Sequence, residues 1–201
     1  MIRCLVTDRR RLAGAGASFD YARRVLLAQL ETAVSDGVDL IQVRERDLED
    51  GALAALVDAV VSLVHGTTSR VVVNDRLDVA LACRADGVHL RGDSIRTPDA
   101  RRIAPSGFLI GRSVHTVDEA SAAGGADYLI AGTVYPSPSK APSTTLLGAD
   151  GLRAIVRAAQ APVLAIGGVT VQRFDEIAAA GAAGVAGIGL FLPFDSPKPA
   201  P

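Results

Sequence analysis

Short apolar runs alternate with helical patterns along the whole chain, and this alternation limits the folds open to it. Eight runs rich in Val, Ile and Leu occupy residues 2–8, 40–45, 70–75, 87–90, 108–114, 128–134, 162–168 and 184–190. Continuous runs of this kind are typical of strands buried on both faces, as in a parallel sheet. Eight consecutive β/α units within 201 residues predict an α/β fold, a single-domain (β/α)8 TIM barrel. An open, doubly wound sheet is the alternative, but the alternation has no break, which favours closure.

Helical patterns fill the gaps between these runs. The two longest cover residues 19–37 and 47–64, where apolar side chains recur every three or four positions and form one stripe. Shorter helices are expected near residues 76–83, 97–104, 117–124, 149–159 and 171–181, the last ending at Gly181. Each of the first seven strands is therefore predicted to have a helix after it.

The end of the chain departs from this regularity. Residues 192–201 read LPFDSPKPAP, with four prolines in ten positions, and cannot continue a helix. We therefore expect a barrel domain over residues 1–191 whose last helix is missing or truncated, and a Pro-rich tail over residues 192–201. A partner subunit could cover the bare flank, so the chain could form a homo-oligomer.

Charge and cysteine content exclude several classes of function. The formal net charge is -1, so no overall basic field favours nucleic acid or an anionic membrane. Neither a signal peptide nor an apolar run of transmembrane length is evident. Cys4 and Cys83 each lie in an apolar run without metal-ligand spacing, as expected of reduced core residues. The sequence predicts a cytoplasmic protein whose anion sites are local.

Polar residues gather where the predicted strands end, which is where barrels place their active sites. Gln42, Arg44 and Arg46 alternate along the end of the second strand, so a two-residue period points them to one face. An ordinary solvated strand end would explain one arginine more easily than three aligned polar side chains. Two cations beside an amide predict an anion site.

The next strand ends offer oxygen ligands. Asn74 and Asp75 end the third strand, and Asp93 follows the fourth. Carboxylates in this position suit Mg²⁺, although Asn and Asp are also common in turns and at helix N-termini. Ser113 and His115 end the fifth strand, and His115 could simply precede a helix.

Two glycine pairs predict a second anion site. Gly167 with Gly168 and Gly187 with Gly189 end the last two strands, where exposed backbone N–H groups suit a phosphate. Before both pairs in the sequence, the loop AGTVYPSPSK (131–140) carries Ser137, Ser139 and Lys140 after a buried strand. This loop is either a rigid surface turn or an anion-binding segment. Together the strand ends suit two phosphate-bearing substrates.

At this point the motifs are recognisable as a set. The chain contains, in this order, the motifs LIQVRER, VNDRLDVALACRADGVHL, GRSVHT, ADYLIAGTVYPSPSK and PVLAIGGVT with GAAGVAGIGLF. The matching region begins at VTDR, residue 6, and ends at Phe191. The chain resembles the superfamily of thiamine phosphate synthases and thiazole tautomerases over nearly its whole length. The resemblance implies a Mg²⁺-dependent transferase that joins hydroxymethylpyrimidine pyrophosphate to thiazole phosphate. In that chemistry pyrophosphate leaves first, and the thiazole nitrogen captures the resulting cation.

The resemblance also implies roles for individual residues. Arg44, Lys140 and Ser113 would be catalytic, contacting the pyrophosphate as it leaves. Asp75 would bind the metal, with Asp93 as a displaced second ligand. The full set of implied substrate-binding residues is Gln42, Arg44, Arg46, Asn74, Ser113, Ser137, Ser139, Lys140, Gly168, Ile188 and Gly189.

The sequence departs from the synthase pattern after the fourth strand. HLRGDS has Ser94 where the synthase has its second metal-binding Asp, Asp93 one residue early, and Arg91 where Gly is usual. A metal-free thiazole tautomerase often has Ser at that place, but its catalytic His is Thr133 here. His115 could be a substitute base. Synthase, tautomerase-like isomerase and non-catalytic thiazole phosphate-binding barrel are therefore the three hypotheses.

Overall fold

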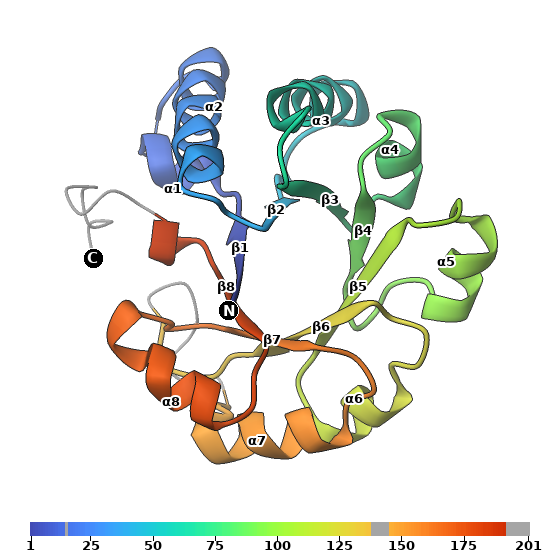
Figure 1. Cartoon of the computed structure of the whole chain (residues 1–201). Coiled ribbons are helices and arrows are strands. Elements are labelled where there is room, and N and C mark those ends of the chain that lie inside the picture. Colours follow the sequence, from blue (N-terminus) through green and yellow to red (C-terminus); the bar gives the residue numbers. More distant parts are fainter. Residues whose placement is uncertain (15, 138–144, 192–201) are drawn as a thin grey trace.

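The structure is a computed structural model that describes residues 1–14, 16–137 and 145–191. Eight parallel strands pair in chain order and close into a barrel, with β1 hydrogen-bonded to both β2 and β8 (Figure 1). They are β1 Ile2–Val6, β2 Leu40–Val43, β3 Arg70–Asn74, β4 Gly87–Leu90, β5 Leu109–Val114, β6 Tyr128–Gly132, β7 Val163–Ile166 and β8 Gly184–Gly187. The closed barrel is confirmed, and the open sheet is excluded.

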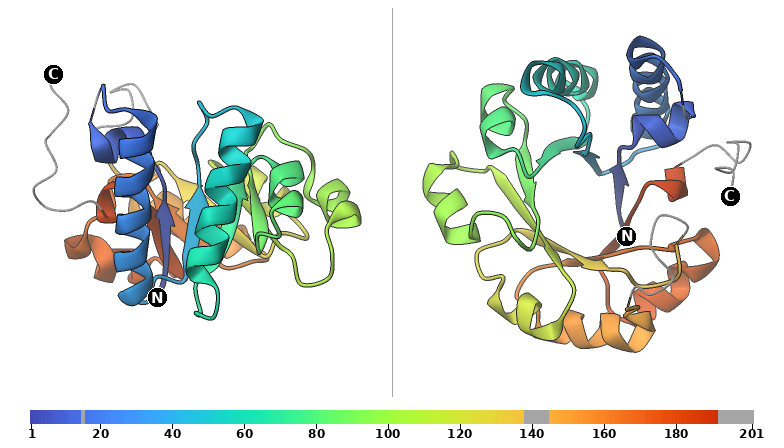
Figure 2. Two further views of the ribbon diagram at one scale, coloured as in Figure 1. Left: turned by 90° about the horizontal axis from the view of Figure 1, so that it is seen from above. Right: turned by 180° about the vertical axis from the view of Figure 1, so that it is seen from behind.

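The seven predicted helices are present on the outside of the barrel (Figures 1 and 2). They are α2 Phe19–Ser35, α3 Asp50–Val64, α4 Leu77–Ala82, α5 Thr97–Ile103, α6 Val117–Ala122, α7 Gly148–Ala158 and α8 Phe174–Ala179. One further short helix, α1 Arg9–Ala13, was not predicted, because five residues with three arginines show no apolar stripe. A 3-10 turn, η1 Val171–Arg173, precedes α8 and starts the predicted last helix. Gly181, with φ 89°, follows the end of α8 as expected.

After β8 the described chain forms only a 3-10 turn, η2 Gly189–Phe191. The proline-rich tail over 192–201, and with it the fate of the eighth helix, lies outside the described residues. No helix in the described part of the chain is both long and apolar enough to cross a lipid bilayer.

Two apolar layers hold the barrel together. The interior is filled by side chains that point to the barrel axis, among them Val6, Val72 and Ile130. Between the sheet and the helices, the predicted stripes are buried: Leu26 and Leu56 are both 0% exposed. Each such leucine contributes about 1.5–3 kcal/mol relative to an exposed one. These two layers fix where each strand ends, and the strand ends hold the site.

Six of the eight strands end earlier than the apolar runs suggest, whereas β4 and β5 end where they were predicted to end. At three of the early ends the cause is local. At β2, the backbone N–H of Arg44 donates to the hydroxyl of Thr7 at 2.9 Å instead of continuing the ladder. At β3, Asp75 takes a φ of 63°, and at β7, Gly167 takes a φ of 96°. A left-handed residue turns the chain out of the sheet. Arg44, Arg46 and Asp75 therefore lie just past their strands, whereas Gln42, Asn74 and Ser113 lie at the ends of theirs.

Candidate active site

A single cavity of about 960 Å³ opens at the carboxyl ends of the strands. Most of the predicted site residues line it, namely Gln42, Arg44, Arg46, Asn74, Asp93, Ser113, Ser137, Gly168, Ile188 and Gly189. Asp75 is not among the lining residues and lies behind Arg91 and Ser94. Ser139 and Lys140 lie outside the described residues. The sequence thus located the mouth of the barrel correctly.

Three guanidinium groups meet at one side of the cavity. Arg44, Arg46 and Arg91 all line it, and no ion pair of Arg44 or Arg46 occurs among the described residues. Burial lowers the pKa of Arg44, and the neighbouring charges of Arg46 and Arg91 lower it further. Arg91 has acidic partners, and the charges of Asp8 and Glu45 raise the pKa of Arg44, but burial and the two neighbouring cations outweigh them. Close cations repel one another unless an anion joins them. This side of the cavity is therefore suited to a highly charged anion.

A buried network holds Arg44 in place. The Arg44 N–H donates to Thr7, which is 0% exposed and itself hydrogen-bonded to the Glu45 carboxylate. Glu45 is ion-paired to Arg9 at 2.6 Å, and Arg9 also contacts Asp47 at 2.7 Å. The hydrogen bond to Asp47 is the largest of several contacts that raise the pKa of Arg9. Glu45 alternates with the arginines along the sequence and must face away from the cavity, which is a faint signal for this network.

The predicted metal ligands are already paired with the chain's own cation. Arg91 contacts Asp75 at 3.5 Å through one terminal nitrogen and Asp93 at 2.7 Å through the other. Ser94 donates its hydroxyl to Asp75 and accepts the Arg91 backbone N–H at 2.8 Å. Both carboxylate oxygens of Asp75 are thus engaged by protein donors.

This arrangement does not fit a divalent metal ion. Mg²⁺ needs free oxygen ligands in near-octahedral order, and a guanidinium between the two carboxylates occupies them. Nowhere in the described ranges do three or more His, Cys, Asp or Glu side chains come together as a metal site. An ion could reach Asp75 only after Arg91 had moved away.

At the floor of the cavity, Tyr128, His89 and Ser113 form a hydrogen-bonded chain. The Nδ1 atom of His89 lies 3.2 Å from the Tyr128 hydroxyl, and Nε2 lies 2.9 Å from the Ser113 hydroxyl. Burial, together with the nearby charge of Arg112, lowers the pKa of His89 to about 3, so the ring is neutral. Burial also raises the pKa of Tyr128 well above its ordinary value.

These contacts fix the direction of each proton. The Tyr128 hydroxyl has no other hydrogen-bond partner in the described part of the chain, so it donates to Nδ1. The His89 proton then resides on Nε2 and is donated to the Ser113 oxygen. The Ser113 proton is left to point into the cavity, where it can be donated to an anion.

The opposite side of the cavity is built from backbone. Gly168 has a φ of 61°, and a Cβ there would come within 2.3 Å of the Pro136 carbonyl oxygen. A Cβ at Gly167 would come within 2.4 Å of the Thr133 side chain. Only glycine allows the loops after β6 and β7 to approach this closely. Ile188 and Gly189 complete this wall from the last strand.

Arg173 adds a cation to this backbone wall and was missed in the sequence. Its guanidinium lies over the Tyr135 ring, 3.9 Å from the centroid. One buried terminal nitrogen has no hydrogen-bond partner among the described residues, and the side chain lines the cavity. It lies in the 3-10 turn η1 rather than at the end of a strand, so no strand-end pattern marked it. The cavity thus has two cationic sides.

The residues relevant to the tautomerase hypothesis are also in the cavity wall. Thr133, where that enzyme has its catalytic histidine, is 8% exposed and cannot exchange protons near neutral pH. The Nδ1 atom of His115 is hydrogen-bonded to the Gly132 carbonyl oxygen, so this nitrogen carries the proton. Nε2 of His115 therefore keeps its lone pair and is the ring nitrogen that can accept a proton.

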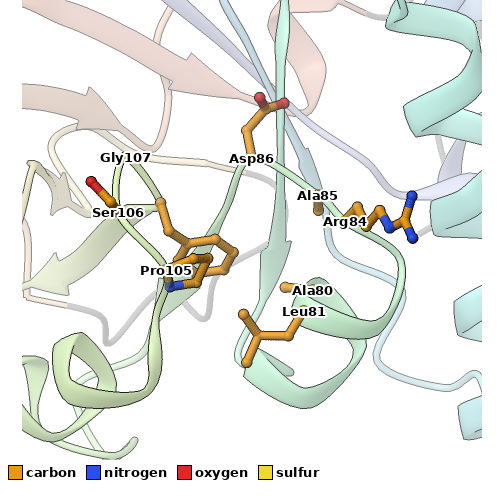
Figure 3. A pocket seen from close by; sticks show the side chains of 9 residues that line it. Ala80, Leu81, Arg84, Ala85, Asp86, Pro105, Ser106 and Gly107 are labelled. Atoms are coloured by element: carbon orange, nitrogen blue, oxygen red, sulfur yellow. The ribbon is translucent and has the colours of Figure 1, made fainter.

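A smaller hollow of about 300 Å³ lies at the other end of the barrel, between α4 and the loop before β5 (Figure 3). Leu81 and Pro105 are among its walls. Its one carboxylate, Asp86, accepts the Val71 N–H at 2.7 Å. This hollow has no convergent polar groups comparable to those of the main cavity.

Comparison with known proteins identifies one family. The family model described as thiamine monophosphate synthase matches residues 6–191. A thiamine-phosphate synthase of Methanospirillum hungatei is 42% identical over 162 residues, covering 80% of this chain and 79% of that protein. Another, from Roseiflexus castenholzii, is 37% identical over 198 residues, covering 98% and 83%.

Solved structures give the same result. A thiamine phosphate pyrophosphorylase from Pyrococcus furiosus superposes with a TM-score of 0.80 at 31% identity, covering 97% of this chain and 89% of that one. A 3-hexulose-6-phosphate synthase at 18% identity and a TM-score of 0.63 shares the fold alone. This chain therefore belongs to the thiamine monophosphate synthase family.

Proposed function

We propose that this chain is a thiamine-phosphate synthase, a transferase that joins hydroxymethylpyrimidine pyrophosphate to thiazole phosphate. The C–O bond between the pyrimidine methylene carbon and pyrophosphate breaks, and its electron pair leaves with the pyrophosphate oxygen. The thiazole nitrogen then donates its lone pair to the methylene carbon, which gives thiamine phosphate and free pyrophosphate. No oxidant or reductant is consumed, and near neutral pH the released pyrophosphate takes up one proton from solvent.

One observation carries this proposal: the cavity has two separate anion-binding sides. Arg44, Arg46 and Arg91 form one, and the backbone at Gly168 and Gly189 forms the other. A substrate pair in which one partner bears pyrophosphate and the other a phosphate monoester fits these two sides. Arg173 strengthens the monoester side.

On the pyrophosphate side, the residues lower the energy of bond breaking. Negative charge builds on the pyrophosphate oxygen as the C–O bond lengthens, and fixed cations next to it stabilise that charge. Thr7 holds the backbone of the half-buried Arg44, which anchors the base of this side chain at the cavity. Ser113 donates its outward-pointing proton to the same anion. We assign Lys140 to this side as well, as the family resemblance implies.

At the centre, Gln42 is placed to hold the pyrimidine. It is 3% exposed, lines the cavity, and its amide nitrogen has no hydrogen-bond partner among the described residues. A buried amide donor without a partner is costly, and an acceptor nitrogen on the pyrimidine ring would satisfy it. Asn74 lines the same region and would hold the pyrimidine with it. Ser137 and Ser139 are assigned to the thiazole phosphate.

The direct test is product formation. Purified protein is incubated with both phosphorylated substrates, and thiamine phosphate and pyrophosphate are both quantified. Equimolar appearance of the two products is expected. The matched control is Arg44→Gln, which removes one cation from the cavity and should lower the rate by roughly 10²–10³-fold, as loss of one stabilising donor does.

A tautomerase-like isomerase is the second candidate, and His115 is the one feature that favours it. Its Nε2 atom could take up a proton within the cavity. Isomerisation of a thiazole carboxylate phosphate without added metal would support it, and His115→Ala retaining that activity would remove His115 as the base. A non-catalytic barrel would bind thiazole phosphate and turn over neither substrate pair.

Further expectations complete the proposal. Both cysteines are free and buried, and burial raises the pKa of Cys4 to about 12, which suits a reducing compartment such as the cytoplasm. The homo-oligomer stays a prediction, tested by light scattering. We expect no nucleic-acid partner. The Mg²⁺ requirement that the family resemblance implies is tested by running the assay with Mg²⁺ and with chelator.

A further inference from the structure

Among the described residues of the cavity wall, Arg91 pairs with both predicted metal ligands and also lies near Arg44. Its two terminal nitrogens contact different carboxylates, Asp75 at 3.5 Å and Asp93 at 2.7 Å. The same side chain lines the cavity close enough to Arg44 to lower the pKa of that residue. Arg91 therefore brings positive charge to the place where a metal ion would otherwise bring it.

The surrounding loop is built to keep Arg91 there. The Ser94 hydroxyl accepts the Arg91 N–H at 2.8 Å and donates its own proton to Asp75. A serine at this position thus ties the loop to the carboxylate that a metal would need. The Arg91 contact to Asp75 is long, and its side chain is 37% exposed, so the guanidinium can turn toward an anion while it stays near both acids.

We propose that Arg91 is a further catalytic residue that contacts the pyrophosphate group directly and takes over much of the metal ion's role in this chain. The inference rests on the proposed function, because it assumes a pyrophosphate leaving group. A planar guanidinium presents paired N–H donors that match two oxygens of a phosphate. As the C–O bond breaks, Arg91 stabilises the electron pair that moves onto the pyrophosphate oxygen.

As a consequence, pyrophosphate binding and thiamine phosphate formation should both depend only weakly on a metal ion. One fixed guanidinium carries half the charge of Mg²⁺, and Arg44 and Arg46 stand beside it. Two neighbouring acids would compete with pyrophosphate for Arg91, and pairing with them sets its position before the substrate arrives. Arg91 should therefore matter most when no metal is present.

Binding of inorganic pyrophosphate tests this without catalysis. Calorimetry is run in EDTA on the wild type, Arg91→Gln and Arg96→Gln. Arg96 is the matched control, since it is an arginine five positions away that pairs with Asp99 at 2.8 Å and does not line the cavity. Arg91→Gln should weaken binding by about tenfold or more, as loss of a charge-assisted hydrogen bond does. Arg96→Gln should bind as the wild type does.

The converse experiment installs a metal requirement. The double variant Arg91→Gly with Ser94→Asp removes the guanidinium and adds a carboxylate next to Asp75 and Asp93. Thiamine phosphate formation by the wild type should persist in EDTA, whereas the double variant should need Mg²⁺ and recover with it. Unfolding midpoints of all variants are measured to exclude a folding defect.

Two results would overturn the inference: equal pyrophosphate affinity of the wild type and Arg91→Gln in EDTA, or complete loss of wild-type activity in EDTA. If no condition gives thiamine phosphate while Arg91 still governs pyrophosphate binding, the proposed function fails and the pyrophosphate contact stands. The two failures are thus distinguishable.

Discussion

The Nε2 atom of His89 lies 2.9 Å from the Ser113 hydroxyl oxygen, at the floor of the cavity. On the far side of the same ring, Nδ1 lies 3.2 Å from the hydroxyl of Tyr128. A neutral imidazole can carry one proton, so a donor on one side decides what it does on the other. Through this ring Tyr128, which is only 6% exposed, determines which way the hydroxyl proton of Ser113 points in the cavity.

The serine and the tyrosine should therefore act as one unit. Ser113→Ala is expected to lower kcat by about 10²-fold, because a donor to the leaving anion is lost. Tyr128→Phe should give a smaller loss, since the imidazole can then place its proton on either nitrogen. In the double variant, Tyr128→Phe should cost almost nothing further. Steady-state kinetics of the four proteins measure this, with the exposed Tyr21→Phe as the control. Additive losses would contradict the coupling.

Acid should destabilise the fold through His89. The folded-state pKa is lowered to about 3, below the ordinary value of 6.5, so the unfolded chain binds the extra proton first as pH falls. Stability should thus fall as pH drops from about 6.5 toward 3, by up to about 1.4 kcal/mol per pH unit from this group. Urea unfolding at several pH values measures the slope.

The histidine variants separate this effect from other acid-sensitive groups. His89→Gln should show a flatter stability profile between pH 6 and 4 than the wild type. His65→Gln, a change at an exposed residue after α3, should keep the wild-type slope. A His89→Gln profile as steep as the wild type would refute the assignment.

Removing one partner of the Arg9–Glu45 ion pair should destabilise the fold more than removing both partners. Their side chains are 7% and 3% exposed, so Arg9→Met leaves a buried carboxylate without its main partner. We expect that single change to destabilise the fold by about 3–5 kcal/mol. Arg9→Met combined with Glu45→Met should cost clearly less. Chemical denaturation of the four proteins gives the cycle, and a double variant as unstable as the sum of the two single variants would count against a coupled pair.

Arg173 should serve the thiazole phosphate. One buried nitrogen of Arg173 has no hydrogen-bond partner among the residues that the structure describes, and the side chain lines the cavity beside Gly168, which suits a phosphate monoester. Arg173→Met is expected to raise KM for thiazole phosphate by about tenfold while the KM for the pyrimidine substrate stays the same. Arg157→Met, at an exposed position on α7, is the control. Equal effects on both KM values would show that Arg173 supports the structure rather than this substrate.

Much of the fold could be predicted from sequence because the strong signals are local. Apolar runs of four to seven residues and the stripes at Leu26 and Leu56 depend on neighbouring residues alone, and the structure confirms them. The strand-end positions of Gln42, Arg44 and Ser113 followed from the barrel rule, and the cavity brings them together.

The missed features depend on contacts between distant segments. Glu45 meets Arg9 across 36 positions, and Arg91 meets Asp75 across 16, so no spacing pattern marks either pair. Arg173 gains its place from a 3-10 turn that only the packed barrel defines. The predicted end of the third strand lies too far along the chain, because Asp75 has a left-handed backbone conformation. That conformation depends on tertiary contacts, which residue propensities do not reveal.

The central claim is tested most directly by incubating the purified chain with hydroxymethylpyrimidine pyrophosphate and thiazole phosphate and measuring both products. Thiamine phosphate and pyrophosphate released in equal amounts, with strong loss in Arg44→Gln, is the predicted result. Intact substrates after prolonged incubation with a folded protein, with and without Mg²⁺, would contradict the assignment of this cavity to thiamine phosphate synthesis.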